Sequence, residues 1–157
     1  MLKNKTKNLV GIVLIFVILS FFQVLQASEN LNFLSLKNKK VNLRQGPSFE
    51  YPVKFIYKKK YLPVFVLDKS GPWRKIKDFE SNSGWIHVSQ LSKRKSAINK
   101  KNNSIIYKNP TIFSKPIAKL ETGRLVLVSK CKKKWCKITS GNFSGWILEN
   151  YLWGKIN

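Results

Sequence analysis

The chain has few of the residues from which most catalytic sites are built. Its 157 residues include one histidine, two cysteines and seven acidic residues. The histidine, His87, lies far along the sequence from both cysteines, so three or four zinc ligands do not come together. Asp78 and Glu80 are the only acids close in sequence, and we expect them in a solvated loop, not in a paired-carboxylate site.

Motifs for nucleophilic catalysis and for phosphate binding are also missing. The sequence contains no Gly-x-Ser-x-Gly elbow and no glycine-rich phosphate loop. His87 falls inside the segment 84–88, which has the pattern of a strand, and we expect its imidazole on a barrel surface. The sequence therefore predicts a protein that is not an enzyme, with no catalytic residue, no metal site and no cofactor.

Arginine is scarce, although the chain is strongly basic. Four arginines accompany 26 lysines, and the formal net charge is +23. Bidentate recognition of phosphates and bases favours arginine, so nucleic acid is not the expected partner. Two interpretations of the lysines remain open. They attract an anionic polymer or lipid surface, or they reflect the AT-rich coding bias that also enriches isoleucine and asparagine.

One long run without charge occurs, and it lies at the N-terminus. Three lysines precede the uncharged residues 9–25, and Ala27 follows at a suitable cleavage position. This order is typical of a secretory signal, so we expect residues 1–27 to be removed. The alternative is an uncleaved anchor, because seventeen residues at about 1.5 Å each nearly span a hydrocarbon core of about 30 Å. Both alternatives place residues 30–157 outside the cytoplasm.

Beyond residue 40 no stretch keeps a helical period over three turns. Short apolar runs instead alternate with glycine, proline, asparagine and lysine, and predict strands at residues 53–57, 62–67, 73–77 and 84–88. Five or six short strands in about 55 residues are typical of a small, strongly bent barrel.

The pattern of the first half of the chain returns about 61 residues later. Trp73 has a counterpart in Trp135, and the pair Gly84-Trp85 has one in Gly145-Trp146. This repetition predicts two copies of one β unit, joined by a short connection at residues 92–103. Since so small a unit is marginal by itself, we expect the two copies to pack on each other.

The repeated residues resemble the bacterial SH3-like (SH3b) domain family. The first copy carries Val41-Asn42-Leu43-Arg44-Gln45-Gly46-Pro47-Ser48, Trp73-Arg74-Lys75-Ile76 and Ser83-Gly84-Trp85-Ile86-His87-x-x-x-Leu91. The second copy departs from this pattern at Ile105-Ile106-Tyr107-Lys108-Asn109-Pro110, and it ends in Tyr151-Leu152-Trp153-Gly154. Together with Cys131-Lys132-Lys133-Lys134-Trp135-Cys136, that ending is similar to the C-terminal copy of tandem SH3-like exported proteins of Gram-negative bacteria.

The resemblance implies an all-β fold of two tandem small SH3-like barrels, at residues 33–98 and 104–154, after a signal peptide or signal-anchor helix. It also implies a binding or adaptor role. The N-terminal segment places this role in the periplasm or outside the cell, anchored in the inner membrane by residues 9–25 if that segment is not cleaved. The implied partner is a cell-envelope peptide, peptidoglycan or a protein. Recognition of proline-rich peptides is not carried over, because the segments 87–90 and 148–151 lack the proline of that motif.

The two cysteines, Cys131 and Cys136, are predicted to form a disulfide. In an exported chain this is the default for such a pair. Strand alternation places Cys136 on the same face as Ile138, towards the core, and Trp135 on the other face. A four-residue loop would then set Cys131 across the hairpin from Cys136.

A candidate binding surface follows from the same alternation and from the resemblance. If Ile76 faces the core, Trp73 faces outward. In SH3 folds the long first loop, here with Phe49 and Tyr51, lies beside the strand that carries this tryptophan. We therefore expect an aromatic shelf of these three rings, with Arg44 as a hydrogen-bond donor at its edge. The alternative is that the rings seal the two repeats together; Trp85 and Trp146 are expected to be structural.

Overall fold

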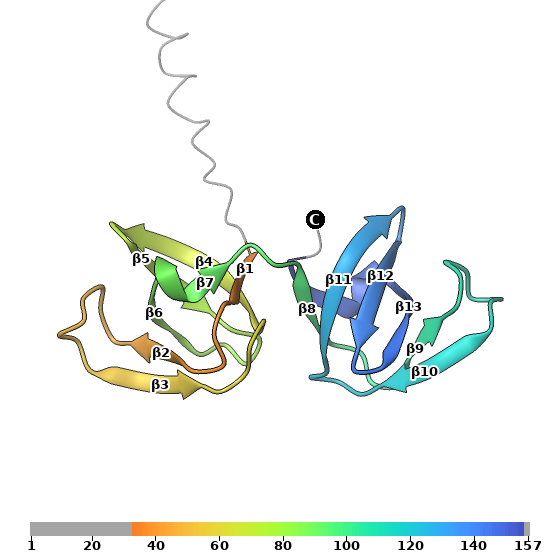
Figure 1. The fold of residues 1–157 in the computed structure, drawn as a ribbon, viewed down its shortest axis with the longest axis horizontal. Coiled ribbons are helices and arrows are strands. Elements are labelled where there is room, and N and C mark those ends of the chain that lie inside the picture. The colour runs from red at the N-terminus through yellow and green to blue at the C-terminus, as the bar shows by residue number, and fades with distance from the viewer. Residues whose placement is uncertain (1–32, 156–157) are drawn as a thin grey trace, which may run out of the picture. The chain divides into compact units, whose positions relative to one another are not determined.

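The computed structural model describes residues 33–155, which form fourteen β-strands and two short 3-10 helices (Figure 1). The signal peptide or anchor predicted at residues 1–27 lies outside the described residues. Between residues 33 and 155, no helix combines the length and the apolar character that crossing a membrane requires. The described part of the chain is thus all-β, as the sequence predicts.

The first sheet contains seven antiparallel strands in the order β3-β2-β6-β5-β4-β1-β7. The turn between β4 and β5 falls at Gly71-Pro72, as the glycine and proline positions predict. Its elements are β1 (Phe33–Leu36), β2 (Val41–Arg44), β3 (Val53–Tyr57), β4 (Pro63–Ser70), β5 (Trp73–Lys77), β6 (Ser83–His87), η2 (Val88–Gln90) and β7 (Leu91–Ser92).

The second sheet repeats this topology, with the strand order β10-β9-β13-β12-β11-β8-β14. Each strand occupies the place of the strand seven positions earlier, which confirms the two tandem units. Its elements are β8 (Ser96–Asn99), β9 (Ser104–Tyr107), β10 (Pro116–Leu120), β11 (Leu125–Lys132), β12 (Trp135–Ser140), β13 (Phe143–Leu148), η3 (Glu149–Tyr151) and β14 (Leu152–Lys155).

The pairing of strand β8 places the boundary between the two units earlier in the chain than the sequence predicts. The predicted ranges, 33–98 and 104–154, place most of Ser96–Asn99 in the first unit, but this strand pairs with β11 and β14 of the second sheet. All four of its residues are buried, so it shows none of the alternation by which a strand is recognised. The second barrel therefore begins at Ser96, and the connection after β7 is only about three residues long.

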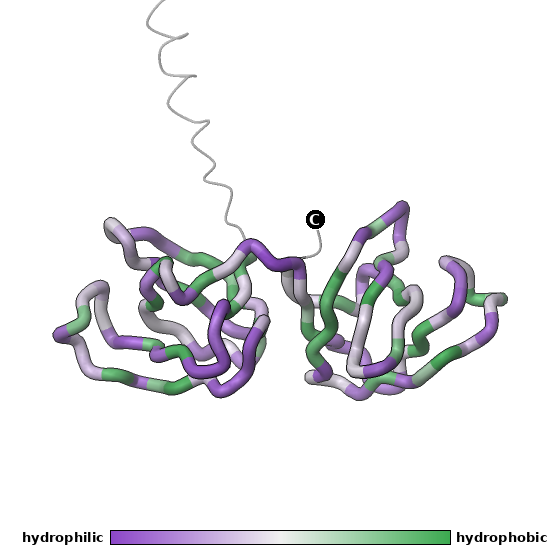
Figure 2. Tube along the Cα trace, viewed as in Figure 1, coloured by the Kyte–Doolittle hydropathy of each residue, from purple (hydrophilic) through white to green (hydrophobic). Residues whose placement is uncertain are grey.

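Each barrel has its own hydrophobic core. Alternate strand residues point inward, and Figure 2 shows hydrophobic residues along the strands of both sheets. The first core includes Val41, Leu43, Val64, Ile76 and Ile86, and the second includes Ile106, Val126, Ile138, Ile147 and Leu152. Within residues 33–155, Trp153 contacts both Phe33 and Phe79, with ring centroids 4.9 and 5.7 Å apart.

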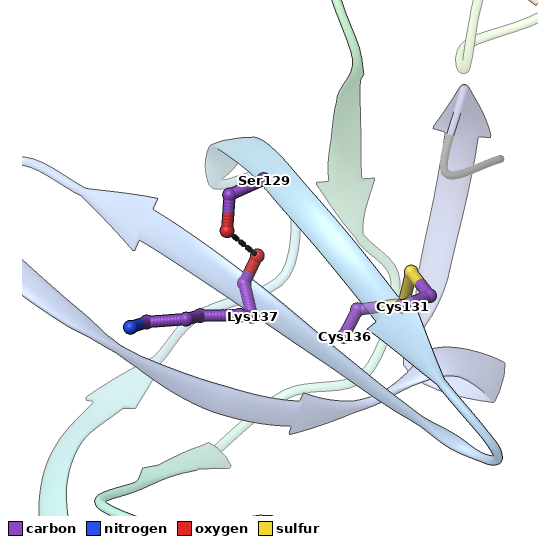
Figure 3. Close-up of a disulfide and its surroundings, with 4 residues drawn as sticks. All are labelled: Ser129, Cys131, Cys136 and Lys137. Atoms are coloured by element: carbon purple, nitrogen blue, oxygen red, sulfur yellow. Dashed lines mark hydrogen bonds between the residues drawn. A yellow bond between two sulfur atoms is a disulfide. The ribbon is translucent and has the colours of Figure 1, made fainter.

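Cys131 and Cys136 form the predicted disulfide (Figure 3). They lie directly opposite each other on β11 and β12, with Cα atoms 4.0 Å apart. Cys136 is fully buried in the second core, as the alternation predicts, and Cys131 packs against that core. The ladder continues one pair further, to Lys132 and Trp135, so the turn is shorter than the expected four residues.

Replacing both cysteines by serine is expected to destabilise the second barrel by about 2 kcal/mol. The bridge closes a short loop, so it removes little entropy from the unfolded chain. Thermal unfolding followed by circular dichroism measures the loss, with the reduced wild-type chain as a control. An unchanged melting temperature in the double variant would contradict this role.

Asp78 lies in a different environment from the solvated loop that the sequence suggests. Its carboxylate is only 5% exposed and accepts a hydrogen bond of 2.9 Å from the hydroxyl of Tyr57. It also accepts bonds from the backbone N–H groups of Glu80 and Asn82, at 3.0 and 2.8 Å, and from the Asn82 side chain at 2.9 Å. Asp78 thus holds the turn between β5 and β6 together and ties it to β3. Burying a carboxylate requires such partners.

This arrangement makes the first barrel sensitive to alkaline pH. Burial, followed by the hydrogen bond to the Asp78 carboxylate, raises the pKa of Tyr57 well above its ordinary value of 10.0. In the unfolded chain Tyr57 loses its proton first, so the unfolded state binds fewer protons above pH 10 and stability falls as the pH rises. We therefore expect the free energy of unfolding of Tyr57→Phe to fall less steeply with rising pH than that of the wild type. Urea unfolding of both chains between about pH 9 and 11 tests this; parallel slopes would contradict it.

Candidate functional site

Three rings from separate parts of the first barrel pack together on its surface. Phe49, in the loop between β2 and β3, lies 4.9 Å from Trp73 and 5.4 Å from His87, measured between ring centroids. The rings of Trp73 and His87 are 5.2 Å apart because these residues face each other across β5 and β6. We call these three residues the aromatic platform.

Exposure divides the platform into a surface and a support. Phe49 is 63% exposed, whereas Trp73 is only 6% exposed. Trp73 points away from the core cluster that contains Ile76, as alternation predicts, but Phe49 and His87 cover it. The expectation of an outward-facing Trp73 is therefore correct in direction and wrong in exposure. A ligand on this surface would meet Phe49 first.

The alternative in which these rings seal the two repeats together does not fit the contacts of Trp73. Its ring partners, Phe49 and His87, both belong to the first barrel. Trp153 instead makes the ring contacts between the two sheets, with Phe33 and Phe79. The platform is consequently a feature of the first barrel alone.

Arg44 fastens the loop that carries Phe49. Its guanidinium donates a 2.7 Å hydrogen bond to the backbone carbonyl of Tyr51, and lies 5.6 Å from the Phe49 ring centroid. The ring of Tyr51, which is 47% exposed, covers Gly46 so closely that a Cβ there would lie 2.6 Å from it. The structure thus brings Arg44, Phe49 and Trp73 together, while Tyr51 joins them through its carbonyl and not through its ring.

His87 is the member of the platform that the sequence analysis missed. The expected position on the barrel surface is correct, but a part in the site is not recognisable from one lone histidine. Its Nδ1 lies 2.8 Å from the Ser89 hydroxyl and accepts a 3.3 Å bond from the Ser89 backbone N–H. These contacts fix the ring beside Phe49. The feature that could have identified His87 is the pairing of β5 with β6, both of which the sequence predicts as strands, because it sets residue 87 opposite residue 73.

The second barrel carries a version of the same surface with different aromatic residues, since Phe113, beside Ile112, is 91% exposed. Tyr107 and Trp135 pack at 5.7 Å, and Ile112 stands where the first barrel has Phe49. Ile112 is 57% exposed, and a pocket of about 180 Å³ opens between it and Tyr107. Lys101 borders this pocket, with its ammonium 4.3 Å from the Tyr151 ring centroid. The two surfaces therefore differ in the side chain that they offer to a ligand.

Trp85 and Trp146 are half-buried residues on β6 and β13. Each follows a glycine at which a neighbouring strand approaches closely. A Cβ on Gly84 would lie 2.7 Å from the carbonyl oxygen of Arg44, and one on Gly145 would lie 2.5 Å from that of Tyr107. The glycines are required by this close approach of backbones.

Among residues 33–155, no three His, Cys, Asp or Glu side chains gather as a metal site would require. The buried carboxylate of Asp78 accepts hydrogen bonds from Tyr57, Glu80 and Asn82.

A sequence model of the bacterial SH3 domain family matches this chain twice, at residues 37–93 and 100–154. A comparison with curated proteins finds no match. Three solved structures resemble it: NlpC2 from Trichomonas vaginalis (15% identity, TM-score 0.37), NlpC1 from the same organism (13%, 0.35) and an NlpC/P60 family protein from Bacillus cereus (14%, 0.34). These alignments cover 82%, 81% and 78% of this chain and 50%, 47% and 56% of those chains, so this chain spans about half of their length.

Proposed function

The chain belongs to the bacterial SH3 domain family, and from this premise we propose that it is a non-catalytic binding module of the cell envelope. The family consists of binding domains, which supports the coarse assignment. We propose in addition that the ligand is a cell-envelope peptide, peptidoglycan or a protein partner, and that it docks on the aromatic platform of the first barrel.

The observation that carries this proposal is the exposure of Phe49 on a rigid support. Phe49 is 63% exposed, so a ligand can reach most of its apolar surface. The rings of Trp73 and His87 pack against the Phe49 ring, and Arg44 donates a hydrogen bond to the loop that carries it. A ligand that covers Phe49 therefore gains apolar contact and orders few additional side chains.

The proposed location is the periplasm or the cell exterior. It is supported by the basic start, the uncharged segment 9–25 and Ala27, which together are typical of a secretory signal. The disulfide between Cys131 and Cys136 is consistent with an oxidising compartment. Cleavage after Ala27 and retention of residues 9–25 as an inner-membrane anchor give mature chains of different mass.

A second candidate function is binding to an anionic polymer or lipid surface. It is favoured by the end of the β11–β12 hairpin, where Lys130, Lys132, Lys133 and Lys134 are all exposed. Such a cluster attracts polyanions and releases their counterions, so binding of this kind weakens steeply with salt.

Capture of partners from a cell-envelope extract at low and at high salt tests the two candidates. A ligand of the aromatic platform should be retained at both salt concentrations, because apolar contact is insensitive to ionic strength. A ligand of the lysine cluster should be lost at high salt. Retention by the wild type together with loss in Phe49→Ala supports the proposed function. Capture that disappears entirely at high salt would contradict it.

A further inference from the structure

The outer strand of the first sheet has an unusual surface for its position. Strand β3 stands at one end of the strand order and pairs only with β2 among the described residues. Three of its apolar side chains are exposed: Val53 by 40%, Phe55 by 43% and Ile56 by 40%. An exposed edge strand with apolar side chains is a template for another strand, and proteins normally protect such edges.

The second barrel shows that the fold itself does not need this surface. Strand β10 holds the same place in its sheet and pairs with β9 in the same register. By that register, Ala118 corresponds to Phe55 and Lys119 to Ile56. One barrel thus forms with a small and a charged residue at the two positions where the other exposes a large aromatic and a large aliphatic side chain.

A groove runs beside β3. It has a volume of about 590 Å³ and takes its apolar lining from Phe55, Ile56, Leu62 and Phe79, among other residues. Phe55 also packs edge-on against Tyr57, with ring centroids 4.9 Å apart, so its ring has a defined position. Edge and groove together offer unpaired backbone groups beside apolar side chains, which is the surface that strand addition uses.

The charge around the groove indicates the kind of strand that fits. Residues 53–60 contain four lysines and no acid, and Lys58 and Lys59 line the groove. The lining also contains Asp78, which is engaged by Tyr57 and Asn82, and the exposed Glu80. Ile98, Thr122 and Gly123 of the second barrel complete it. A second copy of the chain would bring a second set of the same lysines to this edge, and like charges close together are unfavourable in a β pairing. An acidic strand would pair with them.

We propose that β3 is a second binding site, which adds an extended, acidic peptide segment of a partner protein to the first sheet. The peptide pairs with the free edge of β3. Its apolar side chains lie on the face of Val53 and Phe55, and its carboxylates lie on the opposite face, with Lys54 and Lys58. This site is separate from the aromatic platform, so Phe49→Ala should leave it unchanged.

The test uses the protein as purified from cells and three capped heptapeptides. One alternates valine and glutamate, one alternates valine and lysine, and the third is the acidic peptide with a central proline, which cannot donate to a β ladder. Amide chemical shifts in NMR spectra locate each peptide and give its affinity. We expect the acidic peptide to perturb residues 53–60 and to bind at least tenfold more tightly than the other two.

The decisive variant truncates both residues, Phe55→Ala with Ile56→Ala. It should bind the acidic peptide at least tenfold more weakly while its melting temperature stays within a few degrees of the wild type. Phe113→Ala, which removes an aromatic ring that is 91% exposed elsewhere, is the matched control and should bind as the wild type does.

Four results would overturn the proposal. The first is that about 1 mM acidic peptide does not bind the wild type, since a complex with a Kd of about 1 mM would be half-formed at that concentration. The second is that the double variant binds the acidic peptide as tightly as the wild type does. Equal binding of the basic peptide would remove the charge argument. A dimer of the wild-type chain that the double variant no longer forms would assign the edge to a second copy.

Discussion

Replacing Trp73 by alanine is expected to lower the free energy of unfolding of the first barrel by about 3 to 5 kcal/mol. The ring is 6% exposed and is packed between Phe49 and His87, so its removal leaves a cavity under the platform. Urea unfolding followed by far-ultraviolet circular dichroism measures the loss. The matched control is Trp135→Ala in the second barrel, where the ring is only half-buried and a smaller loss is expected.

This result would also separate the two roles within the platform. A loss below about 1 kcal/mol for Trp73→Ala would mean that the ring supports nothing and would contradict the division into surface and support. Phe49→Ala, by contrast, removes a largely exposed ring and should change stability by no more than about 1 kcal/mol. Trp73 is thus expected to act on binding through Phe49, and not by contact with the ligand.

Replacing Asp78 by alanine is expected to cost about 3 kcal/mol of stability in the first barrel. The change removes the acceptor for the Tyr57 hydroxyl and for two backbone N–H groups of the turn, and it leaves them without partners in a buried place. Asp78→Asn keeps the shape and one acceptor oxygen, so a smaller loss is expected. Equal stability of wild type and Asp78→Ala would show that water satisfies these donors.

The double variant Asp78→Ala with Tyr57→Phe is the control for this account. If the loss comes from the unsatisfied hydroxyl, removing both partners should be less destabilising than the sum of the single changes. The second barrel supports this expectation, because Leu120 and Ser140 stand at the two places and that barrel folds without the pair.

Local patterns in the sequence predicted the strands that alternate between polar and apolar residues. Strands β3 and β5 have the predicted bounds, 53–57 and 73–77, because each follows a clear turn and carries a β-branched or aromatic residue at regular spacing. Strand β8 was missed because Ser96, Ala97, Ile98 and Asn99 are all buried, so no period marks them. The sequence of a fully buried strand that contains polar residues therefore resembles the sequence of a loop between two units.

The site was predictable in part for a similar reason. Alternation gave the direction of Trp73, and the resemblance to SH3-like domains gave the loop that carries Phe49. The role of His87 and the burial of Asp78 depend on partners from other strands, at positions 73 and 57, which no local pattern identifies. The bond from Arg44 to the carbonyl of Tyr51 depends likewise on the path of the loop.

Phe49, supported by Trp73 and His87, is the proposed ligand contact of the first barrel. The most direct measurement is the amount of cell-envelope material that Phe49→Ala retains at high salt, compared with the wild type and with Ile112→Ala at the matched position of the second barrel. The account predicts that Phe49→Ala loses about 2 kcal/mol of binding, roughly a thirtyfold weakening, while Ile112→Ala binds as the wild type does. Equal retention by Phe49→Ala and the wild type, with both chains folded, would contradict it.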